Sequence, residues 1–491
     1  MSLAFESLGV GALGIYLVLL IGVGALARRA RRDLTPADHF LAGRGLGLFV
    51  VFLTLYATAY SGNSLLGYPG EAYRRGFSWV MATGFMMAII VVFHAMVPRL
   101  RPLAIREGFV TPGDWIRHRF AGEPGAEALR AAIAVLMSLA LANFLLAQLM
   151  AMGHVTSQVT GDLVPYAAGV AGLGALILVY ETVGGMRAVA WTDAGQGVLM
   201  LVGLGVLLVW LLGDEGGLAE VTARIAAVRP EALAVPDNAE RINWASSIAL
   251  LGLASVVYPQ AIQRVYAARS GLTLTRAFAL MSFMPLTTTL VVTVIGWAAI
   301  PRLEGLGRIE ADTVMPQLLA EWGASSPLHA ALAVLVFLGA LAAIMSTADS
   351  VLLSLGSVVA VDLLSRPGRA TETTLLGKRV AAGLMALAVV LALVPRFTLW
   401  RLIELKMELL IQCVPAFLLA LHWRRLRAGP ALAGLLAGTA VAAGGTLLGE
   451  HRLAGVHVGV AGLGLNLLVA VLGSARPRAS AARAAPPRRR V

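Results

Sequence analysis

Long stretches that contain no Asp, Glu, Lys or Arg recur along almost the whole chain. They cover residues 7–27, 45–70, 76–98, 131–161, 163–180, 194–213, 242–263, 277–301, 322–348, 380–395, 409–423, 428–449 and 453–475. A helix needs about 20 mostly apolar residues to cross a bilayer. The pattern therefore predicts an all-α polytopic membrane protein, with thirteen transmembrane helices in one domain over residues 1–475. The helix at 409–423 reaches full length only if it takes in Glu408.

The composition excludes the common classes of soluble protein. Of the 491 residues, 58% are hydrophobic and 13% are charged, whereas a soluble domain carries about 25% charged residues. The net charge of +12 does not indicate a nucleic-acid partner, because basic clusters beside membrane spans arise from topology alone. Residues 476–491 are rich in Arg, Pro and Ala, and we expect them to form a basic, disordered tail.

The placement of basic residues predicts the orientation in the cell (inner) membrane. The first apolar run is followed, not preceded, by a cluster of arginines, Arg28, Arg29, Arg31 and Arg32. That order argues against a cleaved signal peptide and places the N-terminus outside. With thirteen alternating spans, the loops assigned to the inside, among them 264–276, hold 27 of the 39 Lys and Arg residues. We therefore expect a multi-pass protein in the lipid bilayer, with its N-terminus outside and its C-terminus in the cytoplasm.

Two of the apolar runs are interrupted by polar residues, glycine and proline. The second run contains Tyr60-Ser61-Gly62-Asn63-Ser64, and the seventh contains Tyr258-Pro259-Gln260. Simple kinks are one explanation, because Gly and Pro are common in membrane helices. The interruptions lie five spans apart, however, which fits a pair of five-helix inverted repeats at about 45–213 and 242–423. Transporters built in this way bind their substrates where the helices unwind near the membrane midplane.

The ninth run carries hydroxyl groups along one face. Ser346, Ser350, Ser354 and Ser357 are spaced by four, four and three residues, which aligns them on one side of a helix. Asp349 lies beside them, and an ionisable residue within a span indicates function. Oxygen ligands suit hard cations. Hydrogen bonds from the hydroxyls to carbonyls one turn earlier are the alternative explanation.

Three stretches of the chain resemble the sodium:solute symporter family. They are Phe40-Leu41-Ala42-Gly43-Arg44 with Gly67-Tyr68-Pro69-Gly70-Glu71-Ala72-Tyr73, the signature-like segment from Tyr180 to Asp193 with Gln196, and Ala343 to Thr347 leading to Asp362. The resemblance extends over about residues 8–475. It implies a LeuT-type fold, and it implies import of a solute coupled to sodium by alternating access.

The resemblance also implies a sodium site between the first broken helix and the ninth span. At the positions of this sequence that match the family's ligands, the site would be formed by the carbonyl oxygens of Ala57, Tyr60 and Ala343 and the side chains of Ser346 and Thr347. A second sodium site, or a release path toward the cytoplasm, would use Asp193, Asp349 and Ser350. A structural hydrogen bond is the other role open to Asp193.

The solute is expected at the midplane, against both broken helices and two other spans. The candidate binding residues are Tyr60, Asn63, Ser64, Asn143, Gln148, Tyr258, Gln260, Glu408 and Gln412. Hydrogen bonds between helices are the alternative for Asn143 and Gln148. A surface position is the alternative for Glu408.

The expected activity is sodium-coupled symport of a small organic solute. Ala59 stands where the resemblance places an Asp in proline carriers, and residues 258–270 resemble a bacterial branch that includes monocarboxylate and pantothenate carriers. We therefore predict import of a monocarboxylate or a pantothenate-like organic acid, with an amino-acid symporter as the alternative. A transporter-like sensor and a channel are the rivals from other classes. A primary pump is not expected, because the sequence has no Gly-rich phosphate-binding motif. An enzyme is not expected either, because no cluster of His, Cys and Asp has metal-ligand spacing and the eight His are scattered.

Overall fold

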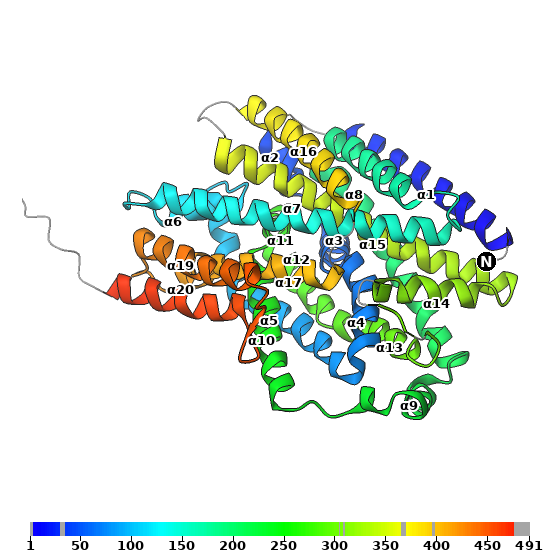
Figure 1. Ribbon diagram of the computed structural model, residues 1–491. Coiled ribbons are helices and arrows are strands. Elements are labelled where there is room, and N and C mark those ends of the chain that lie inside the picture. Colours follow the sequence, from blue (N-terminus) through cyan, green and yellow to red (C-terminus); the bar gives the residue numbers. More distant parts are fainter. Residues whose placement is uncertain are drawn as a thin grey trace, which may run out of the picture.

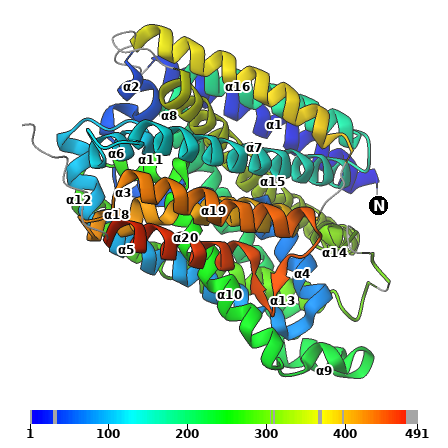
Figure 2. The same cartoon turned by 60° about the vertical axis from the view of Figure 1, so that its left-hand side comes forward.

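The computed structural model describes residues 3–29, 35–303, 305–307, 310–364, 370–394 and 398–475. The tail predicted at 476–491 lies outside these residues. Figures 1 and 2 show long helices running side by side in a bundle, with α1 and α16 along one edge and α19 and α20 next to each other. The N-terminus and the last residues of α20 lie at opposite ends of the bundle (Figure 1).

The first half of the described chain contains nine α-helices. These are α1 (Leu3–Arg29), α2 (Pro36–Leu41), α3 (Leu48–Ala59), α4 (Tyr68–Arg75), α5 (Met81–Arg106), α6 (Pro112–Arg119), α7 (Ala126–Val159), α8 (Tyr166–Gly213) and α9 (Gly217–Val228). Helix α8 is kinked at Gly185, whose φ of 59° and ψ of −155° are not helical. A Cβ atom at this position would lie 2.5 Å from the His39 ring, so both the backbone angles and the space favour glycine.

The second half of the described chain contains eleven α-helices and a small hairpin. The helices are α10 (Asn238–Ala254), α11 (Pro259–Ala267), α12 (Gly271–Met281), α13 (Leu290–Ala298), α14 (Val314–Gly323), α15 (Pro327–Ser357), α16 (Ala370–Ala392), α17 (Leu399–Leu410), α18 (Ala420–His422), α19 (Ala428–Leu447) and α20 (Val458–Ala475). Strands β1 (Arg452–Leu453) and β2 (Val456–His457) pair antiparallel between α19 and α20. Helix α15 packs against α7, α8, α1, α3 and α11, and all of its residues from 339 to 357 are buried.

The hydrophobic pattern explains why helices dominate, because within a bilayer each backbone polar group must find its partner inside the protein. Among the described residues, nine helices are long and apolar enough to span a membrane, or ten if the bent pair α10–α11 counts as one span. Three predicted spans fall outside this set. Two lie on the shorter helices Leu48–Ala59 and Tyr166–Thr182, and the one predicted at 409–423 lies on the end of Leu399–Leu410 and the short helical turns that follow it up to His422. The all-helical polytopic prediction is confirmed, whereas the count of thirteen is not.

Both interruptions in the sequence are breaks in helices. Helix α3 ends at Ala59, Tyr60 has extended backbone angles (φ −105°, ψ 91°), and a π-helical turn, Asn63–Gly67, leads into α4. Gly62 permits close packing here, since a Cβ atom would lie 2.5 Å from the Ile344 side chain of α15. Helices α10 and α11 are bent by 51°, and Pro259, which has no N–H to donate, begins α11.

Candidate functional site

Residues from both breaks line one cavity of about 80 Å³, which also takes side chains from α5, α7, α12 and α17. The lining residues are Leu55, Thr58, Ala59, Ser61, Ser64, Tyr68, Met86, Ile89, Ile90, Phe93, Phe144, Leu251, Ser255, Tyr258, Ala261, Phe278, Met281, Ile403, Lys406 and Met407. Most of this wall is apolar, and hydroxyl groups supply most of its polar atoms. Lys406 is the one charged side chain among the described residues of the wall.

Several polar groups at the breaks have no hydrogen-bond partner among the described residues. The hydroxyls of Thr58 and Ser255 line the cavity and are two of these unpaired groups. Both polar side-chain atoms of Asn63 and of Gln260 are buried and unpaired as well. Because a buried polar group without a partner is costly, such groups call for an explanation. A polar ligand or water in this region would supply the missing hydrogen bonds.

Three of the predicted sodium ligands, Ala57, Ala343 and Thr347, are in contact where the end of α3 meets α15. The last carbonyls of a helix have no partner within that helix, and the Ala57 carbonyl accepts a hydrogen bond of 3.2 Å from Thr347 Oγ1. The same hydroxyl lies 3.0 Å from the carbonyl oxygen of Ala343. Ser346 Oγ donates to Asp193 Oδ1 at 2.5 Å, which leaves its lone pairs free. Tyr60, one residue beyond α3, is buried. Neutral oxygens from both helices are thus brought within reach of one another.

Asp193, in the second half of α8, forms a fully buried ion pair with Arg264 of α11. Arg264 Nη2 lies 2.8 Å from Asp193 Oδ2, and both side chains have no exposed surface. The guanidinium also donates to Thr54 Oγ1 at 2.7 Å, to the Gln260 carbonyl at 3.1 Å and to the hydroxyl of Ser350. Thr54 in turn donates to Asp193. The assignment of Arg264 to an inner loop was therefore wrong, because this residue lies inside α11 with its charge neutralised in the core.

Asp349 points to a different set of partners. Its Oδ2 accepts a hydrogen bond of 2.7 Å from the hydroxyl of Tyr180, and its Oδ1 lies 3.2 Å from Ser350 Oγ. Ser350 donates to the Ser346 carbonyl at 2.6 Å. This is a hydrogen bond to a carbonyl one turn earlier, the alternative explanation that the sequence offered for the serines. This carboxylate has no cation within ion-pair distance among the described residues.

Ser346, Ser350, Ser354 and Ser357 form a serine stripe along one face of α15, and its C-terminal part packs against α11. Ser354 Oγ donates to Gln263 Oε1 at 2.7 Å, and Gln263 Nε2 donates to Ser357 Oγ at 2.7 Å. All three side chains are buried. In this conformation the stripe is therefore filled by side chains of α11.

Only two of the nine predicted solute-binding residues, Ser64 and Tyr258, line the cavity. Gln148 Oε1 accepts from the Gly62 N–H at 3.1 Å and so supports the first break. Asn143 donates to the Leu402 carbonyl at 2.6 Å, and Gln412 donates to the Gly459 carbonyl at 2.8 Å. The bonds of Asn143 and Gln412 both join neighbouring helices. For Asn143 this is the alternative to solute binding that the sequence offered.

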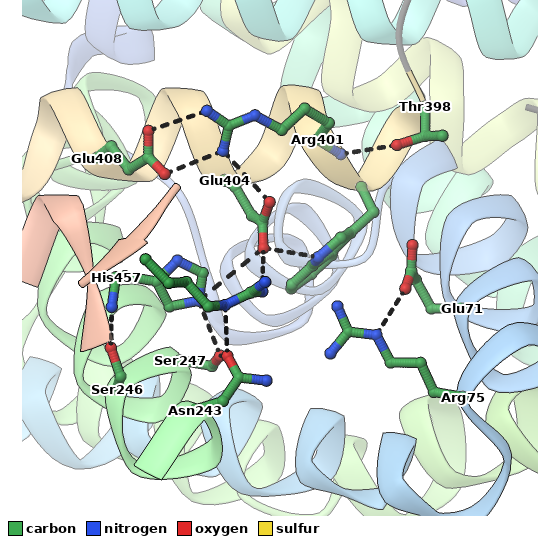
Figure 3. A network of polar contacts seen from close by, with 12 residues as sticks. Glu71, Arg75, Asn243, Ser246, Ser247, Thr398, Arg401, Glu404, Glu408 and His457 are labelled. Atoms are coloured by element: carbon green, nitrogen blue, oxygen red, sulfur yellow. Dashed lines mark hydrogen bonds and ion pairs between the residues drawn. The ribbon is translucent and has the colours of Figure 1, made fainter. Parts of the chain in front are cut away.

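Glu408 lies in a polar network with Arg401 and Glu404 (Figure 3), on the face of α17 opposite to the cavity-lining Lys406. It accepts from Arg401 at 3.0 Å and from Thr446 at 3.1 Å, and it is buried rather than at the surface. Glu404, one turn earlier, accepts from Trp400 and from Arg452 of β1, each at 3.0 Å. The network ties α17 to α19 and to the hairpin.

The sequence interpretation missed Lys406 and Arg264. Lys406 stands between Glu404 and Glu408 in the chain, but positions 403, 406 and 407 share one helix face and positions 401, 404 and 408 share the opposite face. The available signal was the lysine itself, since an ionisable residue inside a span indicates function. Arg264 gave no comparable signal, because a basic residue at the end of an apolar run is usual in a loop.

Comparison with known proteins gives consistent results. The sequence model of the sodium:solute symporter family matches residues 39–438. The chain is 26% identical to the osmoregulated proline transporter OpuE of Bacillus subtilis, over 94% of this chain and 93% of that protein. It is 28% identical to the high-affinity proline transporter PutP of the same organism, over 86% of this chain and 88% of that protein. It is 30% identical to the sodium/pantothenate symporter of Escherichia coli, over 46% of each chain.

Solved structures identify the fold. A Na⁺-coupled sialic acid symporter in a substrate-bound outward-open state has a TM-score of 0.76 at 17% identity, and the match covers 95% of this chain and 97% of that one. Mhp1, a nucleobase-cation-symport-1 transporter, has a TM-score of 0.57 at 16% identity, over 90% and 96%. The predicted LeuT-type fold is confirmed. The repeat boundaries at about 45–213 and 242–423 stay a prediction.

Proposed function

Since this chain belongs to the sodium:solute symporter family, we propose that it imports a small organic acid together with sodium by alternating access. The observation that carries the coupling is the contact of Thr347 Oγ1 with the carbonyls of Ala57 and Ala343, at 3.2 and 3.0 Å. These atoms come from the two elements between which the sodium site was predicted. They also lie beside a helix break that contributes to the cavity wall.

The proposed sodium ligands are neutral oxygens. They are the carbonyls of Ala57, Tyr60 and Ala343 and the hydroxyls of Ser346 and Thr347. A hydroxyl that now donates to a carbonyl can turn its lone pair toward a cation, so Thr347 needs only a rotation of its O–H bond to become a ligand. Ser346 already directs its proton to Asp193. We therefore assign Asp193 the role of orienting Ser346, with its charge balanced by Arg264.

The exit of sodium is proposed to follow Asp349 and Ser350, which continue along α15 from the sodium ligands. A carboxylate there attracts a departing cation once water reaches it. The side chains of Gln263 and Arg264 on α11 occupy the serine stripe in this conformation. Movement of α11 away from α15 would open this route.

The organic-acid class is supported by what the relatives share. Two of them are named as proline transporters and one as a sodium/pantothenate symporter, and proline and pantothenate both carry a carboxylate. An amino-acid symporter therefore remains the second candidate, favoured by the proline transporters that match most of the chain. The two candidates differ in whether the site also accepts an ammonium group.

Sodium coupling is tested by uptake into proteoliposomes, with and without an inward sodium gradient. The panel contains radiolabelled propionate, lactate, pantothenate and proline. Thr347→Ala removes one proposed ligand and is expected to raise the sodium concentration for half-maximal uptake at least several-fold. Thr439→Ala on α19 removes a hydroxyl with the same bond to a carbonyl one turn earlier and is expected to leave that concentration unchanged. Uptake that needs no sodium would refute the coupling, and flux without saturation would indicate a channel.

A further inference from the structure

Lys406 is a buried lysine whose amine has no anionic partner among the described residues. Its side chain is 2% exposed, and its Nζ lies 3.1 Å from the centroid of the Phe144 ring and 4.7 Å from that of Tyr258. No carboxylate of the described chain approaches it within ion-pair distance. By contrast, the fully buried Arg264 is paired with Asp193, and the mostly buried Arg401 is paired with Glu404 and Glu408.

A lysine in such a place needs an explanation. Removing an ammonium group from water is costly, and ring faces offset only a part of that cost. The lysine cannot turn back to the acids of its own helix, because Glu404 and Glu408 lie on the opposite face and are held by Arg401 and Arg452 (Figure 3). The same network fixes the rotation of α17, so that Lys406 faces the cavity. The arrangement leaves the amine of Lys406 ready for an anion from outside the chain, whose charge would stabilise the ammonium form.

A second, independent observation points to a ligand at the same place. The hydroxyls of Ser255 and Thr58 line the cavity and are buried without partners among the described residues. The rest of the wall is largely apolar, with Met86, Ile90 and Phe278 among its residues. One cation, a few free hydroxyls and a large apolar surface match a molecule with one carboxylate and a mostly apolar body.

We propose that Lys406 binds the carboxylate of the transported solute, and that this solute is a monocarboxylate without a free amine. The inference rests on the proposed function and narrows its substrate class. An ammonium group on the solute would find no acidic side chain in the described wall and would be repelled by Lys406. A second carboxylate would likewise find no second cation there. Lys406 thus separates monocarboxylates from amino acids and from dicarboxylates.

The first experiment measures binding by thermal stabilisation of the purified protein in sodium buffer. The probes are propionate, lactate and pantothenate, the amides of propionate and lactate, and proline. We expect the acids to stabilise the wild-type protein at concentrations at least about tenfold lower than their amides, since a charge-assisted bond to a buried ammonium is lost in the amide. Proline is expected to bind no better than the amides. Equal binding of acids and amides, tighter binding of proline, or no stabilisation by any of the acids would overturn the inference.

The second experiment changes the lysine. Lys406→Met keeps the length and apolar stem and is expected to weaken binding of the acids at least about tenfold, whereas Lys406→Arg retains most of it. Lys378→Met on α16 is the matched control, because Lys378 is the other lysine of the sequence and does not line the cavity. Stabilisation by sodium alone should persist in Lys406→Met, which shows that the protein is folded and its sodium site intact.

The outcomes separate this inference from the function on which it rests. Sodium-driven uptake of proline that Lys406→Met leaves unchanged would refute the role of Lys406 while the sodium coupling stands. Absence of sodium-driven uptake for every probe would refute the proposed function itself. If Lys406→Met does not fold, the comparison of acids with amides in the wild-type protein still decides the matter.

Discussion

The buried pair of Asp193 and Arg264 offers a quantitative test of how the core of the protein is held together. In Asp193→Asn the guanidinium keeps its place between α3, α8, α11 and α15 but loses the carboxylate with which it forms an ion pair. The amide can still accept from Arg264 and Thr54 if its oxygen faces them, and Ser346 can rotate to accept from the NH₂ group. The hydrogen bonds are therefore replaceable, and the charge is not.

The expected cost follows from that difference. Breaking a buried ion pair by removing one partner typically costs about 3–5 kcal/mol, because it leaves an uncompensated charge in a poorly polarisable interior. We expect Asp193→Asn to lower the free energy of unfolding by about that amount. The double variant Asp193→Asn/Arg264→Gln removes the stranded charge and should recover about 2 kcal/mol or more of the loss. Glu220→Gln in the exposed pair with Arg224 on α9 should cost less than about 1 kcal/mol.

The assay is unfolding in mixed micelles, titrated with a denaturing detergent and followed by tryptophan fluorescence for the wild type, the two single variants, the double variant and the Glu220 control. A loss below about 1 kcal/mol in Asp193→Asn would contradict the argument. Additive losses in the double variant would contradict it too, since they would mean that the two charges do not stabilise each other.

Two further predictions concern the ends of the spans. Asp312, outside the spanning segments, accepts from the Leu399 N–H at 2.8 Å, and burial raises the pKa of its carboxyl group to about 6. The folded protein then holds this proton more tightly than the unfolded chain does. The protonated carboxyl therefore makes its full contribution to the free energy of unfolding below about pH 4, and up to about 3 kcal/mol of that contribution is lost as the pH rises through 6. Asp312→Asn should be more stable than the wild type at pH 8 and similar at pH 4 in unfolding titrations; the reverse order would refute the sign. For the topology, a cysteine replacing Ser2, in a background without Cys413, should react with an impermeant thiol reagent in intact cells, and one replacing Ser480 should not; reversed labelling would contradict the orientation.

The fold was predictable because hydropathy and chain geometry decide it together. Apolar runs of sufficient length must be helical in a bilayer, and the Gly and Pro clusters near Gly62 and Pro259 mark both breaks. The number of spans was not predictable to the same degree. Helix α17 carries Glu404, Lys406 and Glu408, so neither length nor hydropathy marks it as a span, and α8 continues through its kink at Gly185.

The candidate site was predictable only in part, because spacing along a chain does not give the partner across a helix interface. Thr347 and Ala57 were placed together through the family resemblance, and they are in contact. Asp193 and Arg264 are 71 positions apart, and no local pattern relates them. In α17 the helical period places Lys406 and Glu408 on opposite faces. Which face turns to the cavity depends on Arg401 and Arg452, which hold Glu404 and Glu408 on the other side.

The charge balance of the core links the two proposals of a neutral sodium site and a cationic solute site. Asp193 and Arg264 cancel each other, and the proposed sodium ligands carry no charge, so neither this ion pair nor the ligands balance the charge of a bound sodium ion. A carboxylate supplies the opposite charge, and its attraction to sodium in a poorly polarisable interior favours binding of both together. By linkage, any gain in solute affinity from sodium equals the gain in sodium affinity from the solute. A zwitterionic solute would add no net charge and so contribute less to this attraction, which gives a physical reason for an acid-specific member of the family to retain an unpaired lysine.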